Sequence, residues 1–91
     1  MRIVRLRITG RVQQVGYRAW AIATARQLSL RGWVRNRSDG AVELLAAGPV
    51  RDVGAFVAAC RSGPEAACVI DIEVIEAEDD GSIGFAARPT E

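Results

Sequence analysis

Apolar and polar residues alternate at the start of the chain, where Val4, Leu6 and Ile8 are separated by arginines. This period of two is typical of a strand with one buried face. From Tyr17 to Leu28 the apolar residues recur instead at i, i+4, i+8 and i+11, without glycine or proline. That spacing predicts an amphipathic helix.

The second part of the chain repeats the same two patterns. Asp39-Gly40 supplies the positive φ that a tight hairpin turn requires, so the segments on either side are predicted to pair as strands. An i, i+3, i+4, i+7 stripe that includes Phe56 predicts a second helix, between Pro49 and Gly63. The predicted strands after the first helix cover residues 30–37, 42–46, 70–75 and 83–87.

The order of these elements predicts the fold. Two β-α-β halves joined by a hairpin give a split βαβ, ferredoxin-like α+β sandwich, β-α-β-β-α-β with a short terminal strand. Its mixed sheet would carry both helices on one face. Residues 1–91 are expected to form a single domain, because the length leaves no room for a second core.

Composition narrows the setting. An apolar content of 49% is ample for a packed core. No apolar run approaches the roughly 18 residues of a membrane span, and arginines interrupt any signal-peptide core near the start. We therefore expect a cytoplasmic protein that has no membrane partner.

The absence of histidine and lysine excludes several kinds of chemistry. All 12 basic residues are arginine, which rules out histidine general bases, His-ligated metals and Schiff-base lysines. Cys60 and Cys68 lack metal-ligand spacing, so no metal and no cofactor are expected. Both cysteines are predicted to be buried thiols. The alternative, a disulfide between them, is not ruled out by the sequence.

The net charge of +1 conceals an asymmetry along the chain. Residues 1–38 hold nine arginines and no acid, whereas residues 39–91 hold eleven acids and three arginines. One interpretation is a basic side of the molecule that steers a small anion. The other is a set of solvated strand faces whose charges pair across the sheet. Extended nucleic-acid binding is not expected, because the basic set is small and the net charge is near zero.

The segment from Gly10 to Arg18 is the strongest candidate for chemistry. It joins the first strand to the first helix, and every residue in it has a backbone N–H. A glycine-containing turn that enters a helix N-terminus is suited to hold an anion. Arg18 adds a guanidinium fork that matches phosphate, at a helix end where a lone cation is unfavourable. These features predict a phosphate site.

Asn36 is the second candidate. Asparagine is common near turns for local reasons, and Asn36 lies just before the hairpin turn. In the predicted fold, however, the second strand runs in the same direction as the first, so its end lies beside the loop before Arg18. There its amide can both donate to and accept from a water molecule.

The aromatic residues Tyr17, Trp20 and Trp33 have two interpretations. They could stack on bases, or they could pack in the core and between helix and sheet. The alternating aromatics of an RNA-binding sheet are missing from the third strand, so we expect packing.

Two motifs resemble those of the acylphosphatase family. Gly10-Arg11-Val12-Gln13 followed by Val15-Gly16-Tyr17-Arg18 looks like its signature loop, and Gly32–Arg37 with Asp39–Glu43 looks like its second motif. The resemblance spans essentially the whole chain. It implies metal-free hydrolysis of the carboxyl–phosphate bond of small acyl phosphates, with catalytic Arg18 and Asn36, the latter orienting the attacking water. Nothing in the sequence demands more than a monomer, which is the oligomeric state we expect. The phosphate-binding loop that it implies is Gln13, Gln14, Val15, Gly16, Tyr17 and Arg18.

The chemistry is compatible with these residue types. The carboxylate that leaves has a conjugate acid of pKa roughly 4, so no general acid is demanded. Phosphoryl transfer depends mainly on positioning and charge stabilisation.

The sequence departs from the family at two loop positions. The family usually has glycine where this chain has Gln14, and a positive φ there would cost glutamine of order 1 kcal/mol. Tyr17 replaces the usual phenylalanine, and its hydroxyl needs a partner if it is buried. An alternative function is therefore a non-catalytic phosphate-binding module impaired by Gln14. A third possible function is that of the acylphosphatase-like domain of a carbamoyl-transferring maturation enzyme. The sequence does not contain the further domains of that larger enzyme, which counts against this third function.

Overall fold

The computed structural model describes all of residues 1–91 and contains five strands and two helices. The elements follow the predicted order, in a sheet of strand order β4-β1-β3-β2-β5. Neighbouring strands are antiparallel except β2 and β5, which are parallel. The elements are β1 (Arg2–Arg11), α1 (Tyr17–Gln27), β2 (Arg31–Asn36), β3 (Val42–Gly48), α2 (Val50–Cys60), β4 (Cys68–Glu76) and β5 (Phe85–Ala87).

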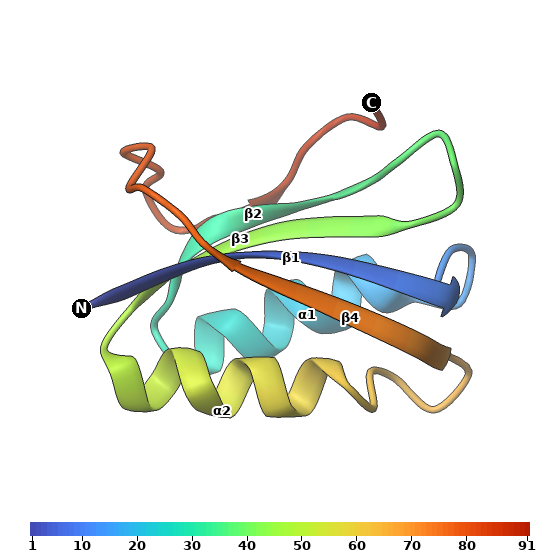
Figure 1. Ribbon diagram of the computed structural model, residues 1–91, viewed down its shortest axis with the longest axis horizontal. Coiled ribbons are helices and arrows are strands. Elements are labelled where there is room, and N and C mark those ends of the chain that lie inside the picture. Colours follow the sequence, from blue (N-terminus) through green and yellow to red (C-terminus); the bar gives the residue numbers. More distant parts are fainter.

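Both helices cover the same face of the sheet, below the strands in Figure 1. The core lies between these two layers, and the inward residues of β1 and β3 are fully buried there with Val53 and Phe56 of α2. The α+β ferredoxin-like sandwich predicted from the sequence is therefore confirmed. Since β1 and β2 both pair antiparallel with β3, they run in the same direction and end on the same side of the molecule.

Helix α1 ends where the chain enters a left-handed conformation. Ser29 has a φ of 56°, and the N–H of Leu30 donates to the Ala25 carbonyl at 2.9 Å. This closure satisfies carbonyls that the last turn would leave free. It also turns the chain back into β2.

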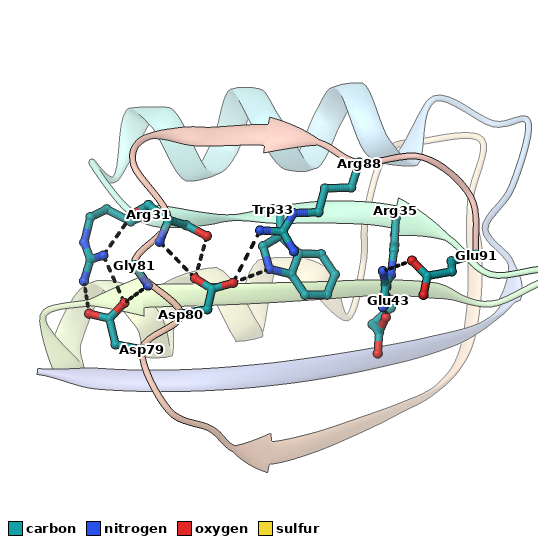
Figure 2. Close-up of polar contacts among 10 residues, drawn as sticks. Arg31, Trp33, Arg35, Glu43, Asp79, Asp80, Gly81, Arg88 and Glu91 are labelled. Atoms are coloured by element: carbon teal, nitrogen blue, oxygen red, sulfur yellow. Dashed lines mark hydrogen bonds and ion pairs between the residues drawn. The ribbon is translucent and has the colours of Figure 1, made fainter.

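The packing of Trp33 differs from expectation. Trp33 is buried, but on the sheet face away from the helices, because its neighbour Val34 takes the inward position on β2. The guanidinium groups of Arg35 and Arg88 lie 4.8 Å from its ring, and its Nε1 donates to Asp80 at 2.9 Å (Figure 2). Trp33 is therefore buried by packing, as expected, but against arginines on the open sheet face rather than between helix and sheet.

Two further details differ from expectation, and a third agrees with it. Cys60 is buried, whereas Cys68, predicted to be buried, is exposed on the edge strand β4; both are free thiols. The terminal strand begins at Phe85 rather than Ile83, whose side chain is exposed. Trp20 is half-buried against the core, as expected.

The charge asymmetry is resolved mainly by ion pairs across the sheet. Of seven ion pairs, six join an arginine of residues 1–38 to an acid of residues 39–91. Figure 2 shows two such groups, Arg31 with Asp79 and Arg35 with Glu43 and Glu91. The pairing interpretation is thus borne out for most of the basic half. Arg18 is not among the paired arginines.

Candidate active site

The loop between β1 and α1 has the backbone of an anion-binding turn. Gln14 and Gly16 have φ values of 61° and 80°, whereas Val15 between them does not enter the left-handed region. Alternation of this kind turns successive N–H groups toward one concave side, where they can surround an anion. The positive φ at Gln14 is the conformation that made glutamine unexpected at this position.

The N–H groups of this loop are unused within the chain. None of the backbone N–H groups of residues 13–16 donates a hydrogen bond to another group of the protein. The first turn of α1 adds further N–H groups that helix geometry leaves free. It has no side-chain cap and no acidic residue. The positive end of the helix is therefore available to an external anion.

These N–H groups border a pocket of about 340 Å³ at the N-terminus of α1. The pocket brings together Arg18 of α1 and Asn36 of β2, the two residues that the sequence singled out as catalytic. It is lined by Val12, Gln14, Gly16, Tyr17, Arg18, Ala19, Ile22, Asn36 and Ala87.

A cavity of similar size, about 380 Å³, lies near the other end of α1. Its two arginines are already engaged: Arg26 donates to the Phe85 carbonyl at 3.1 Å, and Arg31 pairs with Asp79 at 2.7 Å. It also lies beside a helix C-terminus, which repels anions. The pocket with Arg18 is therefore the better anion site.

The side chain of Arg18 is exposed and makes no hydrogen bond or ion pair within the chain. Most arginines of β1 and β2 do; for example, Arg7 pairs with Asp39 and Arg35 with Glu43. A guanidinium left without a partner at the mouth of a pocket, beside free N–H groups, is arranged to bind a phosphate.

Asn36 carries an unsatisfied buried group. Its side-chain Oδ1 is buried and is the one such side-chain atom in the chain without a hydrogen-bond partner. A buried acceptor without a partner is unfavourable by about 1–3 kcal/mol unless water or a ligand satisfies it. Asn36 also lines the pocket, so its side chain is placed beside any molecule held there.

Gln13 and Val15 do not line the pocket. The Gln13 Nε2 instead donates to the carbonyls of Arg37 and Ala41, at 2.8 and 2.9 Å, and Val15 packs against the core. Only their backbone N–H groups are free to serve an anion. Gln13 thereby ties the loop to the hairpin that carries Asn36.

Tyr17 supports the loop from inside. Its ring is buried and its hydroxyl donates to the Cys60 carbonyl at 2.6 Å, so the hydroxyl has the partner it requires. Burial raises the pKa of this hydroxyl and also raises the pKa of the Cys60 thiol to about 12. Both groups are therefore neutral at physiological pH and serve the packing of α1 against α2.

Sequence reasoning missed several apolar residues of the pocket. Ile22 follows Arg18 by one helical turn, a spacing that places both on one helix face and offered a signal. Ala87 lies at the pocket because β5 pairs with β2, where Ala87 is the partner of Val34. No local sequence pattern predicted this pairing. No group of three or more His, Cys, Asp and Glu residues is placed to hold a metal ion. Neither helix has the length and apolar character needed to cross a bilayer.

Fold and site together define a class: a small α+β sandwich with a phosphate-type anion pocket at a strand–loop–helix junction. Comparison with known proteins makes the class specific. The acylphosphatase family model matches residues 4–87. An acylphosphatase of Rhodospirillum rubrum is 46% identical over 90 residues, covering 99% of both chains. The chain belongs to the acylphosphatase family.

Solved structures agree with this assignment. The crystal structure of an acylphosphatase from Bacillus subtilis matches with a TM-score of 0.93 and 39% identity, covering 97% of this chain and 99% of that one. Full-length HypF in its phosphate- and nucleotide-bound form matches with a TM-score of 0.90 and 25% identity. The latter match covers 98% of this chain but only 12% of HypF.

Proposed function

We propose that the pocket between Arg18 and Asn36 is the active site in which this acylphosphatase hydrolyses the carboxyl–phosphate bond of small acyl phosphates. The observation that carries the proposal is that Arg18, Asn36 and the loop with free N–H groups meet in one pocket. A water molecule that donates to Oδ1 would be held at a fixed place beside the bound phosphate.

The phosphoryl group is assigned to the loop and Arg18. The free N–H groups of residues 13–16, with those of the first turn of α1, donate hydrogen bonds to its non-bridging oxygens. The Arg18 guanidinium adds two charge-assisted hydrogen bonds from the rim. Fixed donors of this kind stabilise the negative charge of the transition state without reorganising.

The reaction then needs one bond to form and one to break. The oxygen of the water held by Asn36 attacks phosphorus, and the bond between phosphorus and the carboxyl oxygen breaks. The carboxylate leaves with the bonding electron pair, unprotonated, because its conjugate acid has a pKa of roughly 4. The proton lost by the water goes to a phosphate oxygen, so inorganic phosphate and carboxylate are the products.

No metal is assigned a part in this mechanism, because Arg18 and the loop N–H groups neutralise the phosphate charge. We also propose a monomeric protein in the cytoplasm. The exposed free thiol of Cys68 fits a reducing compartment of that kind.

The direct test is hydrolysis of acetyl phosphate by the wild-type protein with EDTA present, carried out in ¹⁸O-labelled water. The proposal predicts turnover that EDTA leaves unchanged and one labelled oxygen in inorganic phosphate. Label in the acetate would mean attack at the carbonyl carbon. A folded protein that binds phosphate without turnover would instead be the non-catalytic module.

Arg18→Ala tests the phosphate assignment. Removing two charge-assisted contacts, each worth about 1.5–3 kcal/mol, should lower kcat/KM by roughly 10²-fold or more. Arg11→Ala is the matched control, because Arg11 is also an exposed arginine near the loop but does not line the pocket. Equal effects of the two substitutions would show that only the general positive charge matters.

A further inference from the structure

The mouth of the pocket holds very few polar side chains. Its lining includes the buried, apolar Val12 and the buried ring of Tyr17. Among the exposed residues at the mouth, only Gln14 and Arg18 have polar side chains, since the others are glycine and alanine. If Arg18 holds the phosphate, the Gln14 amide is the one exposed polar side chain left to meet the rest of the substrate.

The position of Gln14 also favours such a contact. Its N–H belongs to the phosphate loop, so its side chain starts beside the bound phosphoryl group. That side chain is exposed and makes no hydrogen bond within the chain. The acyl group is joined to phosphorus through one oxygen and therefore lies close to the pocket that Gln14 lines.

We propose that Gln14 determines acyl-group specificity and favours acyl phosphates that carry an N–H beside the carbonyl. This inference rests on the proposed function. A glutamine amide has one acceptor oxygen and two N–H donors. It can donate to the substrate carbonyl and accept from an adjacent substrate N–H, forming two antiparallel hydrogen bonds. An acyl group that has only a carbonyl forms one.

Carbamoyl phosphate and acetyl phosphate are suitable probes, because they differ only in NH₂ against CH₃. The quantity to measure is the ratio of their kcat/KM values, corrected for spontaneous decomposition of each substrate. Both probes carry the same phosphate, so changes in the phosphate loop cancel in this ratio.

The variants are Gln14→Met and Gln14→Asn. Methionine keeps the length of the side chain without its amide, and asparagine keeps an amide in a residue that tolerates a positive φ. Loss of one hydrogen bond should lower the carbamoyl-to-acetyl ratio of Gln14→Met by about five-fold relative to wild type. The ratio of Gln14→Asn should fall between these two values.

An unchanged carbamoyl-to-acetyl ratio in Gln14→Met would overturn the inference, even if both kcat/KM values fell by the same factor. This result would not contradict the proposed function, which requires only that the wild-type protein hydrolyses acyl phosphates. Absence of turnover of both substrates by the folded wild-type protein would contradict the proposed function, and this inference with it.

Discussion

At the residue scale, Gln14 combines a strained backbone with a place in the active-site loop. A non-glycine residue at a φ of 61° is disfavoured, because its Cβ approaches the following carbonyl. Strain of this kind persists where the surroundings hold it, often at functional sites. The sequence predicted the penalty from a resemblance alone, and the backbone shows that this position does adopt a positive φ.

Gln14→Gly should therefore stabilise the fold by about 1 kcal/mol, measured as the shift of the urea unfolding midpoint. Ser29→Gly is a useful comparison, because Ser29 also has a positive φ of 56° but lies outside the pocket. We expect a shift of the same sign and similar size there. A lower midpoint in Gln14→Gly would show that side-chain contacts of Gln14 outweigh its backbone strain.

At the element scale, the site depends on how the β1–α1 loop meets the β2–β3 hairpin. The two Gln13 hydrogen bonds, to the carbonyls of Arg37 and Ala41, join these segments across 24 and 28 residues of sequence. The separation between Arg18 and Asn36 is therefore set partly by a residue whose side chain points away from the pocket.

Gln13→Met keeps the bulk of the side chain and removes both hydrogen bonds. We expect a loss of about 1–2 kcal/mol in the free energy of unfolding and a drop in kcat of roughly tenfold. Gln27→Met is the control, because the side chain of Gln27 is exposed and makes no hydrogen bond within the chain. If Gln13→Met kept the wild-type kcat, the contact between the loop and the hairpin would not be needed for catalysis.

Local patterns predicted the order and type of the elements, because periods of 2 and 3.6 depend only on neighbouring residues. Arg18 was predicted from its place at the start of a helix, which is also a local feature. Asn36 was predicted because the order of the elements fixes the direction of the second strand. The site details that were missed depend on long-range pairing. Ala87 reaches the pocket through β2–β5 pairing, and Trp33 faces away from the helices because Val34 takes the inward position.

At the scale of the whole molecule, most of the charge asymmetry serves the fold. Arginines of the first half pair with acids of the second across the open sheet face and its edges (Figure 2). Surface pairs of this kind contribute little individually. Their main consequence is that five of the nine arginines of the basic half are neutralised by acids. Of the four without an ion pair, only Arg18 lines the pocket with Asn36.

Asp80 makes one part of this network sensitive to acid. Hydrogen bonds from Ser82, with those from Trp33 and the charge of Arg88, lower the pKa of its carboxyl to about 2. A lowered pKa in the folded state contributes stability above the unfolded value of about 4, and that contribution is lost as the pH falls through about 2. The difference in unfolding free energy between wild type and Asp80→Asn should therefore shrink between about pH 4 and pH 2. A difference that stays constant over this range would contradict the assignment.

The central claim is that one pocket divides the work, with Arg18 and the loop holding phosphate and Asn36 positioning water. It is tested most directly by measuring kcat for acetyl phosphate and the inhibition constant of inorganic phosphate in Asn36→Ala. We predict that kcat falls by about 10²-fold, since a positioned group in the transition state is lost, while the inhibition constant changes less than about threefold. A weakened phosphate affinity with kcat preserved would contradict the claim, because Asn36 would then bind phosphate rather than position water.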